Sequence, residues 1–83
     1  AEKHVPVIKV DGNNVTVEIG SAQHPMTEQH YITWVYIQTE KGGQRKMLAP
    51  GEEPCAKFVL TDDDRLQSAY AYCNLHSLWK AYA

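Results

Sequence analysis

The chain has little of several features that mark common classes of protein. Its 83 residues include only two cysteines, and its formal net charge is −2. Two cysteines make no disulfide framework of the kind that stabilises small secreted domains, and a near-neutral charge lacks the basic footprint of a nucleic-acid-binding protein. No apolar run approaches the ~20 residues of a membrane span, and no signal-peptide pattern opens the chain. We therefore expect a cytoplasmic protein that binds neither nucleic acid nor membrane.

The length fits one small domain, covering residues 1–83. A chain of this size buries one hydrophobic core and has little stability to spare. Its hydrophobic share of 43% is ordinary for a folded domain. Because the sequence starts at Ala1 rather than at a methionine, we expect a processed product or a piece of a longer protein, with an N-terminal extension or domain missing.

Alternating apolar and polar residues predict an all-β fold. Residues 5–10 and 15–19 alternate in this way on either side of the turn residues Asp11–Asn14, which is a hairpin signal. Further strands are expected at 31–39, 44–48 and 56–60, with a proline- and glycine-containing loop at 49–54. Short, regularly spaced strands are typical of a β-sandwich or barrel.

The segment from Leu66 to Leu75 fits two patterns. Leu66, Ala69, Tyr70 and Cys73 follow the spacing of a helix face, whereas the residues from Ala69 to Leu75 also alternate as in a strand. The all-β surroundings favour a strand that ends at a loop after Cys73.

Nitrogen and sulfur donors form the most informative pattern. Four histidines, His4, His24, His30 and His76, stand in the contexts K-H-V-P, Q-H-P-M, Q-H-Y-I and C-N-L-H. Cys73 precedes His76 by three residues, a short spacing with which one loop offers two ligands to one ion. Five such donors exceed the four of a structural zinc site. A redox metal, iron above all, is therefore the leading hypothesis.

Other kinds of protein stay open on these residues alone. A copper electron-transfer protein also uses histidine, cysteine and a weak methionine ligand on a β-sandwich, although residues 77–83 contain no methionine after the last histidine. A structural zinc domain would use Cys73 and three of the histidines. An interaction module without a metal leaves the histidine contexts unexplained.

Four segments of the chain resemble the superoxide reductases, a family that includes neelaredoxin and the iron-site domain of desulfoferrodoxin. The segments are E-K-H-V-P at Glu2–Pro6, G-S-A-Q-H-P-M at Gly20–Met26, E-Q-H-Y-I at Glu28–Ile32 and C-N-L-H-S-L-W-K at Cys73–Lys80. They occur in the family's order, and the resemblance extends over essentially the whole chain.

The resemblance implies an immunoglobulin-like β-sandwich that holds one mononuclear non-haem iron. The implied iron ligands are His4, His24, His30 and His76, with Cys73 in the axial position. The implied reaction is the one-electron reduction of superoxide to hydrogen peroxide without release of dioxygen, with rubredoxin or a similar small carrier as the electron donor.

The two residues before His4 also match functional positions of the family. Glu2 corresponds to the glutamate that binds the open site of the ferric resting state, and Lys3 to the lysine that assists superoxide reduction. A homodimer or homotetramer is a further expectation, because aromatic and β-branched strands would suit an interface between copies.

The chain departs from the family pattern in two respects. Ser77 stands where the family usually has a glycine after the C-N-L-H histidine, a position that matters for backbone freedom. The four-cysteine rubredoxin-like domain that desulfoferrodoxins carry at the N-terminus is not in this sequence. Cys55, beside Pro54, is interpreted as a plain thiol.

Overall fold

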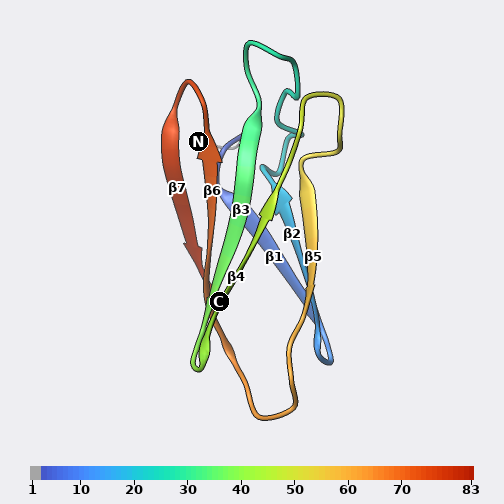
Figure 1. Cartoon of the computed structure of the whole chain (residues 1–83), viewed down its shortest axis with the longest axis vertical. Coiled ribbons are helices and arrows are strands. Elements are labelled where there is room, and N and C mark those ends of the chain that lie inside the picture. Colours follow the sequence, from blue (N-terminus) through green and yellow to red (C-terminus); the bar gives the residue numbers. More distant parts are fainter. Residues whose placement is uncertain (1–2) are drawn as a thin grey trace.

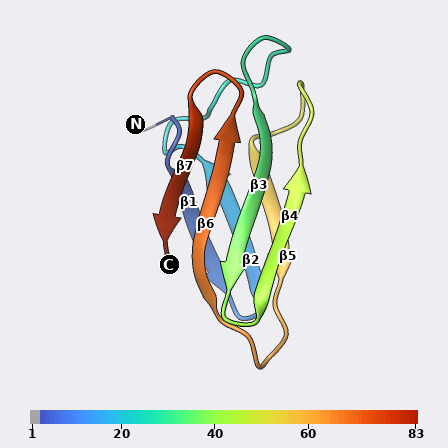
Figure 2. The same ribbon diagram turned by 60° about the vertical axis from the view of Figure 1, so that its left-hand side comes forward.

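Seven antiparallel strands form the fold of residues 3–83, which are the part of the chain that this computed structural model describes. The strands are β1 (Pro6–Asp11), β2 (Asn14–Ile19), β3 (Ile32–Thr39), β4 (Gly42–Met47), β5 (Cys55–Val59), β6 (Leu66–Cys73) and β7 (Ser77–Tyr82). One sheet has the order β1-β2-β5 and the other the order β4-β3-β6-β7. The sheets lie face to face as two layers (Figures 1 and 2). The expected all-β, immunoglobulin-like sandwich is confirmed. No helix of the described residues is long and apolar enough to cross a membrane.

The hairpin expected at the start of the chain is present. β1 pairs with β2 from Pro6 opposite Ile19 to Asp11 opposite Asn14. Gly12, in the turn between them, has a φ of 59°, which glycine adopts without steric cost. The other predicted strands are also found, with ends that differ from the prediction by no more than two residues.

The ambiguous segment forms strand β6, in the middle of the four-stranded sheet. Ala69, Ala71 and Cys73 are fully buried, while Tyr70 and Tyr72 lie on the other face. The helical spacing was therefore the misleading pattern, because β6 pairs with β3 on one side and with β7 on the other.

Strand β7 was missed by the sequence analysis. It has apolar side chains on both faces: Leu78 and Tyr82 are exposed, whereas Trp79 and Ala81 are half-buried. Since period-two alternation of polarity is the signal of a half-buried strand, a strand with apolar residues on both faces does not show it.

Alternate residues of both sheets fill the space between the layers. The buried apolar residues are Val15, Val17, Ile19, Ile32, Val35, Ile37, Ala56, Phe58, Leu60, Ala69, Ala71 and Cys73. Most are β-branched or aromatic, the types that pack well on a pleated surface. Cys73 is thus a core residue as well as a candidate ligand.

The direction of the strands brings distant segments to one end of the sandwich. Because successive strands run antiparallel, the residues before β1 and the β2–β3, β4–β5 and β6–β7 connections emerge at the same end, which is the upper end in Figure 1. All five donors identified in the sequence lie at this end, since they belong to three of these segments or to the last residue of β6.

One close approach in the four-stranded sheet predicts a difference between adjacent glycines. A Cβ atom on Gly43 would collide with the phenol ring of Tyr36, whose hydroxyl donates a hydrogen bond of 2.8 Å to Gln38 Oε1. A Cβ atom on Gly42 would have no atom within 4 Å. We expect Gly43→Ala to lower the free energy of unfolding by about 1–3 kcal/mol, as overpacking does. Gly42→Ala is the matched control and should leave stability unchanged or raise it by up to about 1 kcal/mol. Urea denaturation measures both, and equal effects would contradict the close approach.

Candidate metal centre

The candidate site is built from three segments that are far apart in the sequence. His4 precedes β1, His24 and His30 belong to the long β2–β3 connection, and Cys73 and His76 flank the short turn between β6 and β7. The register of the sheet sets two of these segments side by side: Cys73 pairs with Ile32 on β3, two residues after His30.

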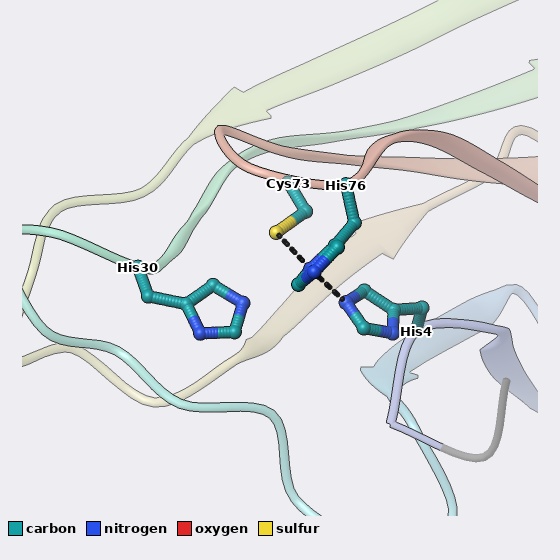
Figure 3. Close-up of side chains that lie close together, drawn as sticks. All are labelled: His4, His30, Cys73 and His76. Carbon is teal, nitrogen blue, oxygen red and sulfur yellow. Dashed lines mark hydrogen bonds between the residues drawn. The ribbon is translucent and has the colours of Figure 1, made fainter.

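Four of the five predicted ligands converge closely. The potential ligand atoms of His4, His30, Cys73 and His76 all lie within 4.8 Å of one another. His76 Nδ1 is 2.9 Å from His4 Nε2 and 3.7 Å from Cys73 Sγ, and the ring of His30 faces the same space from the opposite side (Figure 3). Three imidazoles and a thiol around one point are donors of the kind that bind transition metals.

His24 lies against this cluster but outside the set of four. Its ring centroid is 4.7 Å from that of His4 and 4.7 Å from that of His30, and only 2% of its surface is exposed. His24 Nδ1 donates a hydrogen bond of 2.6 Å to the carbonyl of Pro25. This bond fixes the tautomer of the neutral ring and leaves the lone pair on Nε2.

One nitrogen atom in the cluster and one beside it are buried without a hydrogen-bond partner: Nε2 of His30 and Nε2 of His24. Leaving a buried polar atom unsatisfied is costly, and such atoms in a folded protein require an explanation. A metal ion that accepts both lone pairs would supply it. The donor set therefore fits a bound transition metal.

The environment also favours the neutral form of two of these histidines, His4 and His24. Burial is the largest cause that lowers the pKa of His4 and of His24, and neighbouring histidines lower both further. For His24 the hydrogen bond to Pro25 acts in the opposite direction but does not outweigh burial. Neutral imidazole is the form that binds a metal, so the site is electrostatically prepared for one at neutral pH.

The two predicted catalytic residues differ in what the structure says of them. Lys3 is exposed next to the cluster, and its charge contributes to the lowered pKa of His24. Glu2 lies outside the described residues.

Asn74 is a residue of the site that the sequence analysis did not single out. Its side chain accepts a hydrogen bond of 2.9 Å from Tyr31 N and donates one of 3.0 Å to the carbonyl of Gln29. Its own backbone N–H donates to the carbonyl of Tyr31 at 3.2 Å. Asn74 therefore joins the turn after Cys73 to the residues on both sides of His30. Its place inside the C-N-L-H motif is the only sequence signal that could have indicated this role.

Ser77 adopts a backbone conformation that L-residues usually avoid. Its φ is 67°, in the left-handed region, and it is the only described residue other than glycine with a positive φ. Backbone freedom matters at this position, as the family's usual glycine indicates, and the left-handed conformation explains why a glycine suits it.

Comparison with known proteins identifies the family. The family model for desulfoferrodoxin matches residues 1–82. The chain belongs to the desulfoferrodoxin family. A desulfoferrodoxin homolog from Archaeoglobus fulgidus is 51% identical over 80 residues, which cover 96% of this chain and 62% of that relative. The chain thus spans less than two thirds of the length of this relative.

Solved structures agree with this assignment. The superoxide reductase from Treponema pallidum has a TM-score of 0.94 and 49% identity, covering 96% of this chain and 66% of that one. A superoxide reductase from Giardia intestinalis has a TM-score of 0.83 and 36% identity, covering 100% of this chain and 98% of that one. The resemblance drawn from the four motifs is confirmed.

The left-handed conformation of Ser77 predicts that a glycine stabilises this member of the desulfoferrodoxin family. An L-residue pays about 1–2 kcal/mol in the left-handed region, and glycine's greater freedom in the unfolded chain offsets part of the gain. We expect Ser77→Gly to raise the free energy of unfolding by about 0.5–1 kcal/mol. Ser77→Ala keeps the β-carbon and is the matched control, so it should not stabilise. Thermal unfolding of the three proteins checks this, and a Ser77→Ala variant that gains as much as Ser77→Gly would assign the effect to the hydroxyl instead.

Proposed function

We propose that this chain is a superoxide reductase, which reduces superoxide to hydrogen peroxide by one electron without releasing dioxygen. The observation that carries the proposal is the convergence of His4, His30, His76 and Cys73 ligand atoms within 4.8 Å of one another. Membership of the desulfoferrodoxin family supports it, as do the solved relatives that are named superoxide reductases. The proposal treats residues 1–83 as one iron-binding domain.

The proposed cofactor is a single iron ion held by five ligands: His4, His24, His30, His76 and Cys73. The unsatisfied, buried Nε2 atoms of His24 and His30 support two of these ligands. When bound, iron supplies a one-electron couple, Fe²⁺/Fe³⁺. Cys73 is deprotonated as a ligand and is a softer donor than imidazole, so its thiolate shifts electron density towards the metal.

The residues of the chain then have two tasks: to attract an anion and to deliver protons. Conversion of superoxide into hydrogen peroxide consumes one electron and two protons. We propose that the positive charge of Lys3, exposed next to the cluster, attracts superoxide and orders the water that delivers protons. For Glu2 we propose the role that the resemblance implies, in which its carboxylate would bind the iron in the ferric state.

The electron must reach the site from another molecule. His76 is exposed while Cys73 is fully buried, so the His76 side of the cluster is the accessible one. We propose rubredoxin or a similar small electron carrier as the donor that docks there.

Assembly into a dimer or tetramer is proposed from the outer face of the four-stranded sheet. Met47, Trp34, Tyr72 and Leu78 form one row across all four strands, paired in register. Met47 is 66% exposed, Leu78 51% and Tyr72 37%. A row of exposed apolar side chains is a feature of protein interfaces.

The spectrum of the iron-loaded protein tests the proposal. We expect a broad long-wavelength band that appears on oxidation and bleaches on reduction, because thiolate bound to ferric iron absorbs there. Cys73→Ser should abolish this band and lower superoxide consumption by more than the roughly 10–100-fold that changes beyond the ligands typically cost. The matched control is Cys55→Ser, which changes the other free cysteine and should leave the band intact.

A wild-type protein that stays colourless through this cycle would contradict the proposal. It would favour a structural zinc site built from Cys73 and three histidines, which is redox-silent.

The role of Lys3 is tested by the salt dependence of the reaction. We expect Lys3→Ala to retain iron but to lower the second-order rate constant with superoxide by about 10-fold, at the lower end of electrostatic steering effects. The dependence of the rate on ionic strength should also weaken. Lys41→Ala changes the net charge equally at the opposite end of the sandwich, where Lys41 pairs with Asp63 at 3.4 Å, and should have little effect. Pulse radiolysis over a range of salt concentrations measures both, and equal salt slopes for the two variants would remove Lys3 from the mechanism.

A further inference from the structure

Trp79 contacts two of the candidate ligands, which come from opposite ends of the sequence. Its indole ring is stacked on the imidazole of His4, with centroids 4.9 Å apart and planes inclined by 23°. Its Nε1–H donates a hydrogen bond of 3.0 Å to the backbone carbonyl of His76. One side chain thus restrains a ring from the residues before β1 and the backbone of the β6–β7 turn.

The position of Trp79 in the sheet explains how it reaches both. Trp79 lies on the edge strand β7, opposite Ala71 of β6, which is small and fully buried. Directly paired residues project from the same face of a sheet. The indole of Trp79 therefore lies on the inner face of the four-stranded sheet, as the side chain of Ala71 does. His76 ends the turn that leads into β7, three residues earlier.

His4 has particular need of such a contact. It lies in the segment before β1, outside the sheet pairing that orders the strand residues. The carbonyl of Val5 accepts a hydrogen bond of 3.1 Å from Gly20 N, which holds the backbone after His4. Stacking on Trp79 restricts the imidazole ring itself, and a metal ligand must be held in a defined orientation to bind well.

We propose that Trp79 is a positioning residue of the metal centre: its ring orients His4, and its N–H holds the turn that carries Cys73 and His76. The proposal rests on the metal centre of the proposed function. It assigns no contact between Trp79 and substrate. The two contacts are separable, because phenylalanine keeps an aromatic ring for His4 but has no N–H to donate to His76.

The test measures Co²⁺ binding to the full chain, by competition with a chelator and by the cobalt–thiolate absorption band. We expect Trp79→Leu to weaken Co²⁺ binding by about 10-fold, as loss of an outer-shell partner does, and to shift the band. Trp79→Phe should recover part of the affinity, because it keeps the stacking. In a His4→Ala background Trp79→Leu should cost clearly less, since the stacking partner is already gone.

Trp34→Leu is the matched control, because the chain has two tryptophans. Trp34 stacks on Tyr72 with centroids 5.6 Å apart, on the outer face of the same sheet and away from the ligands. The Trp34→Leu variant should have a lower free energy of unfolding, with unchanged Co²⁺ affinity and an unchanged cobalt–thiolate band. Should Trp79→Leu fail to fold, Trp79→Phe still decides, because loss of the N–H alone must shift the band.

The outcomes separate this inference from the proposed function. Wild-type protein that binds Co²⁺ with a thiolate band, together with Trp79 variants of unchanged affinity and spectrum, would overturn the role of Trp79 alone. Wild-type protein that shows no such band would overturn both proposals. Equal effects of Trp79→Leu and Trp34→Leu on affinity would reduce Trp79 to a general packing residue and contradict the positioning role.

Discussion

The register of β3 against β6 is the constraint on which the rest of the site depends. It sets Ile32, the first residue of β3, opposite Cys73, the last residue of β6, and both side chains are fully buried. A slip of β6 by one residue would turn Cys73 to the outer face and expose the apolar face of that strand. The hydrophobic core therefore determines where the sulfur lies. Because His30 precedes Ile32 by two residues, the same pairing brings a histidine to the sulfur.

The cluster of histidines lowers the stability of the folded chain when no metal is bound. Two buried ring nitrogens, Nε2 of His24 and Nε2 of His30, have no hydrogen-bond partner. These are unfavourable features for a chain with one small core. A metal that binds only the folded protein would offset them, since such binding adds directly to folding stability. The fold can therefore keep buried ring nitrogens without hydrogen-bond partners, because a bound metal ion would satisfy them.

The sequence was informative where the signal was local and uninformative where it depended on distant contacts. Alternation predicted β1 to β5, and the all-β context correctly resolved the segment from Leu66 to Cys73 in favour of a strand. β7 was missed because Leu78 and Trp79 put apolar side chains on both of its faces. The four histidine motifs each have a short local signature, and the three segments that carry them do meet at one end of the sandwich. The hydrogen bonds of Asn74 to the backbone beside His30 join residues more than 40 positions apart, and no local pattern encodes them.

The turn between β6 and β7 holds two of the candidate ligands close together through a short connection. Cys73 and Ser77 are paired across the turn, so only three residues connect the two strands. Ser77, the first residue after this connection, has a φ of 67°. The short connection keeps Cys73 Sγ and His76 Nδ1 within 3.7 Å of each other. Trp79 and Asn74, which both extend from this hairpin, contact the ring of His4 and the backbone on either side of His30. The β6–β7 hairpin therefore carries two candidate ligands and also contacts the segments that carry His4 and His30.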